Sequence, residues 1–241
     1  MRVVCRPGRL TGTLPAIPPK SDAHRILICA ALADAPTRVG MDTRLSGDVA
    51  ATVRCLRALG ASFTDTGDAL TATPISKAPA FPVLDCGESG STLRFLLPVA
   101  AALGCGAVFT GTGRLPQRPI GPLVQAARAG GILADGETLP LRIEGKLSAG
   151  TYTLPGNISS QFISGLLLAF PLLEGGGAIV LEQPLESAAY VEMTRRTLAR
   201  FSVSAAPTES GFSLPAGQAL RTPKEITVEG DWSNTAFFLA A

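Results

Sequence analysis

The amino-acid sequence predicts an inside-out α/β fold, in which three repeated units place buried helices in the centre and β-sheets outside. Two observations carry this prediction. A pattern of short polar residues that opens an apolar helix recurs at intervals of about 70 residues, and an amphipathic helix recurs with the same period. Two separate features with a common period indicate a repeated structural unit. We expect each unit to run strand–helix–strand–helix–strand–strand.

The first helix of each unit is apolar on nearly all sides. Its polar openings are Pro19-Lys20-Ser21-Asp22, Gly87-Glu88-Ser89-Gly90-Ser91 and Gly156-Asn157-Ile158-Ser159-Ser160, and a fourth copy is Gly230-Asp231-Trp232-Ser233-Asn234. The three full helices are expected at residues 22–33, 90–103 and 159–172. Helices with apolar residues all round are buried all round. This places the helices in the core and the sheets outside it.

The other elements of each unit are expected in a constant order. Strands at 37–39, 107–109 and 178–181 follow the apolar helices, and amphipathic helices at 48–59, 120–129 and 190–201 come next. Two short strands close each unit, at 62–64 and 70–72, at 132–133 and 141–143, and at 203–205 and 212–214. Turn residues such as Asp135-Gly136 separate the paired strands.

The composition excludes several classes of protein. Apolar residues make up 46% and charged residues 17%, which is not the composition of a disordered chain. A net charge of +2 gives no broad basic field for nucleic acid. The most apolar stretch, 162–173, is interrupted and too short to span a bilayer, and the first residues lack a signal-peptide pattern. We expect a cytoplasmic protein that binds neither nucleic acid nor membrane.

The cysteines and the single histidine argue against a metal site. No C-x-x-C spacing occurs, and only His24 could add an imidazole ligand, so we expect no metal and place His24 on a helix face. Reduced thiols are expected at Cys5, Cys29, Cys55, Cys86 and Cys105.

Cations and hydroxyl groups stand at the starts of the apolar helices. Lys20 and Arg25 oppose the macrodipole of the first helix, which an anion bound there would explain. Ser159, Ser160 and Gln161 open the third apolar helix and add two hydroxyls and an amide to its free backbone N–H groups. The plain alternative is that Lys20 extends into solvent and one serine caps each helix.

Further candidates stand at the starts of the amphipathic helices. Arg118 precedes Pro119 and can pair with a carboxylate or phosphate, and Ser187 and Tyr190 occupy the matching place in the third unit. A solvated arginine and a packed tyrosine are the alternatives. The repeat symmetry gathers the starts of the apolar helices on one rim, formed by Lys20, Ser21, Gly90, Ser91, Ser159, Ser160 and Gln161. We therefore expect a site for a small polyanion.

Five motifs together resemble those of the EPSP synthase family, the 3-phosphoshikimate 1-carboxyvinyltransferases, in order over essentially the whole chain. They are Pro18-Pro19-Lys20-Ser21-Asp22-Ala23-His24-Arg25, Gly87-Glu88-Ser89-Gly90-Ser91-Thr92-Leu93-Arg94, Gln117-Arg118-Pro119-Ile120, Asn157-Ile158-Ser159-Ser160-Gln161-Phe162 and Glu229-Gly230-Asp231-Trp232-Ser233. The resemblance implies transfer of the enolpyruvyl group of phosphoenolpyruvate to the 5-hydroxyl of shikimate 3-phosphate, by addition and elimination, without metal or cofactor. This step belongs to the shikimate pathway of aromatic amino-acid biosynthesis.

The resemblance also implies a domain organisation. The family has two inside-out domains of three units each, which close on substrates between them. Residues 15–221 would form one three-repeat domain, and residues 1–14 and 222–241 would be segments of a second domain that is largely missing. The apolar helix from Ala236 stops after a few residues, so we expect an N-terminal portion of a longer protein. This portion should be inactive alone, and the full-length protein should be a monomer.

The resemblance assigns roles to particular residues. Lys20 would be catalytic. Shikimate 3-phosphate would contact Lys20, Ser21, Arg25, Ser159, Ser160, Gln161, Ser187 and Tyr190, and phosphoenolpyruvate would contact Lys20, Gly90, Arg118 and Gln161. Glu88, Asp22 and His24 depart from residues that are common in the family, and a carboxylate at position 88 would repel the substrates unless it points away.

Two other functions stay open. UDP-N-acetylglucosamine enolpyruvyl transferases share the fold and the donor, but they typically have Lys-Asn in place of Lys20-Ser21 and a cysteine loop near residues 111–119, where this chain has no cysteine. The other alternative is a non-catalytic, anion-binding half-domain.

Overall fold

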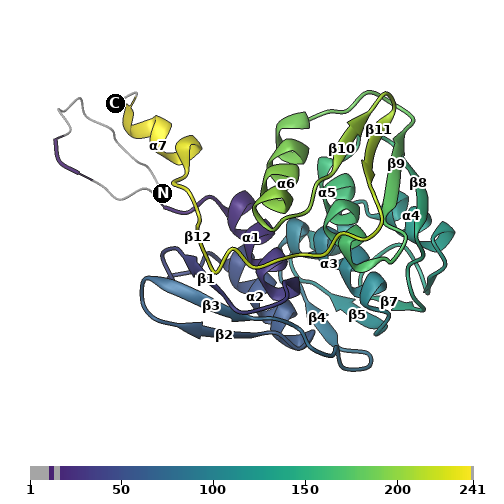
Figure 1. The fold of residues 1–241 in the computed structure, drawn as a ribbon, viewed down its shortest axis with the longest axis horizontal. Coiled ribbons are helices and arrows are strands. Elements are labelled where there is room, and N and C mark those ends of the chain that lie inside the picture. Colours follow the sequence, from purple (N-terminus) through teal and green to yellow (C-terminus); the bar gives the residue numbers. More distant parts are fainter. Residues whose placement is uncertain (1–10, 14–16, 240–241) are drawn as a thin grey trace.

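The computed structural model describes residues 11–13 and 17–239. Within them, three four-stranded sheets lie around a group of central helices (Figure 1). The first sheet has the order β12-β1-β3-β2, the second β4-β5-β7-β6 and the third β8-β9-β11-β10. In each sheet the first two strands are parallel and the other pairings are antiparallel. The three sheets therefore share one topology, as the repeat predicts.

The elements follow the predicted order. The first unit comprises α1 (Lys20–Leu32), β1 (Thr37–Gly40), α2 (Gly47–Ala58), β2 (Ser62–Asp65) and β3 (Ala69–Thr73). The second comprises β4 (Val83–Asp85), α3 (Gly90–Leu103), β5 (Ala107–Thr110), the 3₁₀ helix η1 (Leu115–Gln117), α4 (Gly121–Ala129), β6 (Leu133–Ala134) and β7 (Leu141–Glu144). The third comprises β8 (Gly150–Leu154), α5 (Ser160–Ala169), η2 (Phe170–Leu172), β9 (Gly177–Leu181), α6 (Ala188–Arg200), β10 (Ala206–Thr208) and β11 (Gly211–Leu214). The strand β12 (Glu225–Thr227) and the helix α7 (Trp232–Leu239) come last.

The first sheet takes its outer parallel strand from the far end of the sequence. β12 pairs with β1 through Arg38–Glu225, Val39–Ile226 and Gly40–Thr227. In the other two units the corresponding strands, β4 and β8, immediately precede the apolar helix. Residues 225–227, which the resemblance assigns to a second domain, thus pair with β1 in the first sheet.

One predicted strand is wrong. Residues 203–205 are not a strand, and β10 begins three residues later, at Ala206. The alternation of buried Val203 and Ala205 with Ser204 imitates a strand pattern. The Gln218 side chain, however, bonds both the N–H and the C=O of Ser204, so these groups are occupied outside the sheet. The backbone polar groups are satisfied without a strand partner.

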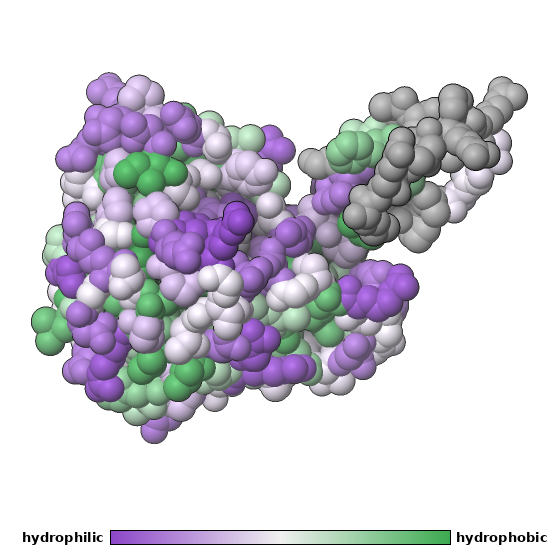
Figure 2. Space-filling view, turned by 180° about the vertical axis from the view of Figure 1, so that it is seen from behind, coloured by the Kyte–Doolittle hydropathy of each residue, from purple (hydrophilic) through white to green (hydrophobic). Residues whose placement is uncertain are grey.

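The helical core is confirmed. Within α1, α3 and α5, all residues of 23–31, 92–102 and 162–169 are buried, and most of the hydrophobic ones belong to a single cluster with residues from the sheets. The sheets cover this core from outside (Figure 1). On the face seen in Figure 2, hydrophobic residues of the main body are scattered among hydrophilic ones. No helix among the described residues has the length and hydrophobicity that a bilayer crossing requires.

The helix α7 projects from the main body (Figure 1). Asp231 stands at its start, where its carboxylate accepts a hydrogen bond from the backbone N–H of Asn234. Trp232, Phe237 and Phe238 are exposed on it, with 74%, 78% and 59% of their surface accessible. The fourth predicted helix opening therefore forms a helix whose aromatic side chains lie outside the core.

Candidate functional site

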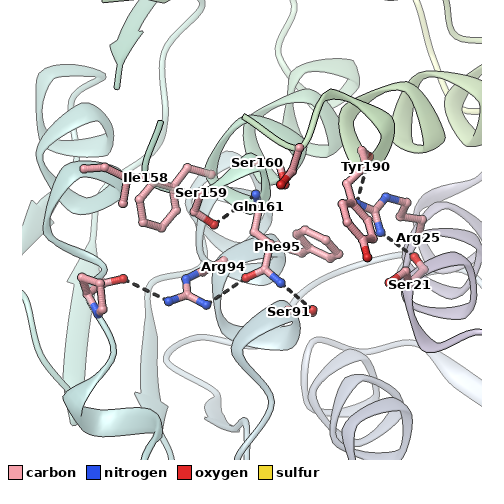
Figure 3. A pocket seen from close by; sticks show the side chains of 13 residues that line it. Ser21, Arg25, Ser91, Arg94, Phe95, Ile158, Ser159, Ser160, Gln161 and Tyr190 are labelled. Atoms are coloured by element: carbon pink, nitrogen blue, oxygen red, sulfur yellow. Dashed lines mark hydrogen bonds between the residues drawn. The ribbon is translucent and has the colours of Figure 1, made fainter. Parts of the chain in front are cut away.

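A cavity of about 450 Å³ lies where the N-terminal ends of α1, α3, α5 and α6 meet (Figure 3). Seven of the predicted site residues line it, namely Ser21, Arg25, Ser159, Ser160, Gln161, Ser187 and Tyr190. The other lining residues are Ser91, Arg94, Phe95, Pro119, Ile158 and Phe162. The predicted convergence of helix starts is thus present, and helix N-termini direct free N–H groups towards anions.

Arg25 is a buried cation that neutral groups hold in place. Its side chain comes from α1, and the residue is only 2% exposed. Nε donates to Thr194 Oγ1 at 2.7 Å, Nη1 to the Ser21 carbonyl at 2.5 Å and Nη2 to the Tyr190 carbonyl at 3.1 Å. The guanidinium carbon lies 4.8 Å from the centre of the Phe95 ring. Burial lowers the pKa of Arg25 to about 10, so the side chain keeps its charge at neutral pH.

Arg94 is a second guanidinium at the same cavity. Nη1 donates to Gln161 Oε1 at 2.8 Å and Nη2 to the Pro119 carbonyl at 3.1 Å (Figure 3). Its buried Nε has no hydrogen-bond partner among the described residues. Burial, and then the nearby Arg118 charge, lower the pKa of Arg94. Both effects favour a bound anion here, because an anion would offset the desolvation and the repulsion between the guanidinium groups.

Gln161 joins the starts of two buried helices. While its amide oxygen accepts from Arg94, its amide nitrogen donates to Ser91 Oγ at 2.9 Å. Ser91 is in the first turn of α3 and Gln161 in the first turn of α5. The amide therefore fixes the spacing of these helix starts at the cavity wall.

The two adjacent serines at the start of α5 differ in their roles. Ser159 is the N-cap, and its hydroxyl accepts from the backbone N–H of Gln161 at 3.3 Å. Ser160 is the first helical residue and is buried at the cavity wall. One hydroxyl satisfies the ordinary capping function, so capping does not account for the second hydroxyl at the cavity.

Ser187 and Tyr190 form the α6 side of the cavity. Ser187 has φ 56° and ψ 41°, the left-handed conformation that is uncommon for a residue with a side chain. Such conformations are often found at functional sites. Tyr190 is half-exposed, and its ring borders the cavity while its carbonyl holds Arg25 (Figure 3).

Three predicted site residues do not line the cavity. Lys20 Nζ bonds Asp48 Oδ2 at 2.8 Å in an exposed ion pair. Two guanidinium groups lie close to Gly90, because a Cβ added to it would be 2.6 Å from Arg94 Nη1 and 2.9 Å from Arg118 Nη1. Arg118 therefore lies next to Arg94, although it does not line the cavity.

His24 and Glu88 do not supply ligands to the cavity. His24 is buried on α1, its Nδ1 is 2.7 Å from Thr52 Oγ1, and burial lowers its pKa to about 4. The histidine is therefore neutral and belongs to the helix face, as expected. The Glu88 carboxylate packs against Gly113 and does not line the cavity.

Five further residues line the cavity without having been predicted from the sequence, namely Arg94, Phe95, Pro119, Ile158 and Phe162. For Arg94 a signal was present, since it is the only charged residue of 90–103, a segment otherwise apolar enough to be buried. A charge within a buried helix needs a partner or a function. No carboxylate lines the cavity, so the described lining carries two guanidinium groups and otherwise neutral residues.

Comparison with known proteins identifies similar chains. The family model described as EPSP synthase (3-phosphoshikimate 1-carboxyvinyltransferase) matches residues 4–241. The 3-phosphoshikimate 1-carboxyvinyltransferase of Clostridium beijerinckii is 38% identical over 98% of this chain and 56% of that protein. The corresponding protein of Clostridium perfringens strain SM101 is 36% identical over 100% of this chain and 57% of that protein. The chain thus spans about half the length of these curated relatives.

Solved structures show the same architecture. EPSP synthase from Acinetobacter baumannii superposes with a TM-score of 0.78 at 28% identity, over 95% of this chain and 52% of that one. The enolpyruvyl transferase NikO from Streptomyces tendae superposes with a TM-score of 0.67 at 15% identity, over 96% of this chain and 55% of that one. At that identity, the second likeness shows the fold alone.

Proposed function

The chain belongs to the EPSP synthase family, and from this we propose that it binds shikimate 3-phosphate and part of phosphoenolpyruvate for enolpyruvyl transfer to the 5-hydroxyl of shikimate 3-phosphate. The observation that carries the proposal is that Arg25 and Arg94 both line one cavity, and that the described residues lining it include no carboxylate. Two buried positive charges among neutral hydrogen-bonding groups suit a small polyanion.

We assign the acceptor substrate to the cavity. Ser21 and Arg25 would hold its ring and carboxylate, and Tyr190 would lie against the ring. Ser159, Ser160 and Ser187 would hold its phosphate. The Ser160 hydroxyl supports this assignment, because Ser160 lines the cavity while Ser159 supplies the helix cap.

We propose that Lys20, Gly90, Arg118 and Gln161 form a neighbouring edge that holds the donor substrate; of these four, Gln161 lines the cavity. Addition joins the acceptor's 5-oxygen to carbon 2 of phosphoenolpyruvate while carbon 3 gains a proton and the hydroxyl loses one. Elimination then breaks the bond to phosphate and removes a proton from carbon 3. Cationic groups at this edge would stabilise the phosphate and carboxylate charges throughout.

Lys20 is the proposed catalytic residue on this side. Its ammonium group now bonds Asp48, in an ion pair in which both side chains are more than a third exposed. Exposed ion pairs contribute little stability. Lys20 can therefore leave Asp48 for a more strongly charged phosphate at small cost. The Glu88 carboxylate packs against Gly113, which is consistent with a site in which no carboxylate repels the anionic substrates.

The organisation of the whole protein is part of the proposal. We propose that the three-repeat domain includes β12, and that the segments beyond it belong with a second domain, which supplies the remaining ligands and acid–base groups. A monomeric, cytoplasmic full-length enzyme remains our expectation.

Calorimetric titration of the 241-residue chain with shikimate 3-phosphate and with shikimate tests the assignment. We expect the phosphorylated ligand to bind more tightly. The double variant Ser159→Ala, Ser160→Ala should weaken its binding about 10- to 100-fold, because hydrogen bonds to charged groups are lost, while shikimate binding changes little. Ser46→Ala is the matched control, since Ser46 precedes α2 and makes no side-chain cap bond. Unchanged affinity in the double variant would refute the phosphate assignment.

A further inference from the structure

Thr194, a buried residue of α6, holds Arg25 from behind the cavity. Its side chain is fully buried, and it does not line the cavity. Its Oγ1 accepts the Arg25 Nε–H at 2.7 Å, and no other acceptor for this N–H exists among the described residues. The Thr194 hydroxyl proton has two acceptors within reach, Ser164 Oγ at 2.8 Å and the Tyr190 carbonyl at 3.1 Å.

Ser164 supports this contact from the third buried helix. It lies on α5, is fully buried, and its Oγ is 3.4 Å from Arg25 Nη2. Thr194 and Ser164 thus join α1, α5 and α6 at one guanidinium group. The hydrogen bonds of Arg25 engage Nε, one N–H of Nη1 and the Nη2 group, and one face of the guanidinium plane covers the Phe95 ring. A guanidinium has five N–H donors, so donor capacity remains for a ligand in the cavity.

The chemistry of the supporting group matters. A carboxylate at position 194 would orient Arg25 and also cancel its charge. A hydroxyl orients it and leaves the charge for the ligand, because a neutral acceptor forms no ion pair. The guanidinium recognises carboxylates and phosphates through its planar fork, so the direction of the plane determines how well an anion fits.

We propose that Thr194 is a positioning residue, whose hydroxyl orients Arg25 towards the cavity and thereby sets the affinity of the site for its anionic substrate. The identity of that substrate rests on the function proposed above, whereas the orientation of Arg25 does not.

The chain offers a closely matched control at Thr197. This residue is one turn further along α6, is 2% exposed, and donates to the carbonyl four residues earlier, at Met193, just as Thr194 does to Tyr190. It makes no bond to Arg25. Thr194→Val and Thr197→Val therefore remove the same atoms from equally buried places on one helix, and Thr194→Ser keeps the hydroxyl.

Nuclear magnetic resonance of the arginine side chains tests the orientation without any substrate. The Arg25 Nε–H signal, assigned by its loss in Arg25→Lys, should exchange slowly with water in the wild type, in Thr194→Ser and in Thr197→Val. In Thr194→Val it should exchange at least about tenfold faster, because its only acceptor is gone. Equal exchange in the two valine variants would overturn the proposal.

Calorimetry with shikimate 3-phosphate, and in parallel with inorganic phosphate, tests the effect on binding. We expect Thr194→Val to bind shikimate 3-phosphate about tenfold more weakly, with Thr194→Ser and Thr197→Val close to the wild type. Thermal unfolding of each variant verifies that it is folded. If both valine variants bound shikimate 3-phosphate equally weakly, the loss of affinity would come from changed packing of α6 and not from the lost bond to Arg25, and the proposal would be overturned. If the wild type binds shikimate 3-phosphate no better than phosphate, while only Thr194→Val weakens phosphate, the proposed function fails and the positioning role stands.

Discussion

His24 and Arg25 are consecutive residues of α1, and burial has opposite consequences for their charges. Both are nearly inaccessible to water, at 1% and 2% exposure. The pKa of His24 falls to about 4, which leaves it neutral, whereas that of Arg25 falls only to about 10. This segment therefore gives the cavity one positive charge at neutral pH. Desolvation penalises every buried cation, but only the histidine has an ordinary pKa close enough to neutrality to lose its proton.

We predict that His24 makes the fold sensitive to mild acid. The pKa of His24 is lower in the folded state than in the unfolded chain. The free energy of unfolding is therefore not reduced by His24 above pH 6.5, and it falls as the pH decreases towards 4 because the unfolded chain binds the proton more readily. Lowering the pH from 7.5 to 5 should therefore reduce the free energy of unfolding by about 2 kcal/mol through His24. Urea unfolding at both values should show this extra loss in the wild type but not in His24→Asn, whose amide stays uncharged. Equal losses in the two proteins would mean that His24 does not become charged on unfolding in this range.

At the scale of elements, α3 and α5 approach each other closely at one glycine. A Cβ added to Gly165 would collide with the backbone carbonyl of Arg94. The contact brings Arg94 beside Gln161, which is in the first turn of α5. The close packing of these two helices thus also builds one wall of the cavity.

Gly165→Ala should destabilise the fold by about 1–3 kcal/mol, because an added methyl group meets backbone that cannot move aside alone. Gly47→Ala is the control, since Gly47 begins α2 and has open space around it. That variant should be neutral or slightly stabilising, as alanine favours helices. Denaturant unfolding measures both. If Gly165→Ala were as stable as Gly47→Ala, the contact between α3 and α5 would have to be looser than described.

The elements that the sequence predicts well are those that recur. The helices 90–103 and 120–129 agree with α3 and α4 to within one residue, because apolar pattern, cap and period indicate the same place. β10 begins three residues later than predicted, because the prediction rests on only three residues that alternate between apolar and polar. The Gln218 side chain bonds the backbone of Ser204 and keeps these residues out of the sheet. Seven cavity residues could be predicted from polar helix starts. Arg94 was not predicted as a cavity residue, because the sequence of one apolar segment does not indicate which surface a charged side chain within it will contact.

The molecule as a whole has a first sheet that depends on residues far apart in the sequence. β12 pairs with β1, Glu225 bonds Arg38, and the side chains of Ile226 and Val228 are buried. No local pattern could indicate this partnership, because Arg38 and Glu225 are 187 residues apart. Periodicity predicts the kind of strand that is needed but not which segment supplies it.

A chain that ends at residue 222 should therefore be less stable than one that ends at residue 230. The shorter chain loses β12 and leaves β1 with an unpaired edge, whereas the longer one keeps β12 and loses Asp231 and α7. Burial of two aliphatic side chains accounts for a fall in melting temperature of about 5–10 °C. Thermal unfolding followed by circular dichroism would detect it. Indistinguishable melting curves would show that β12 contributes little to the sheet.

The segments at the two ends of this domain run side by side where they leave it. The N–H of Asp231 bonds the carbonyl of Ile17 at 2.8 Å, just before α7 departs from the body (Figure 1). Any part of a protein attached to both segments would be connected to this body at one place, through two adjacent segments. A double connection of this kind permits rotation about one pivot but resists twisting, because two segments joined by a hydrogen bond cannot rotate independently. The start of α1, with Lys20 and Ser21, follows this pivot within four residues, so a small swing there would reach the cavity rim directly.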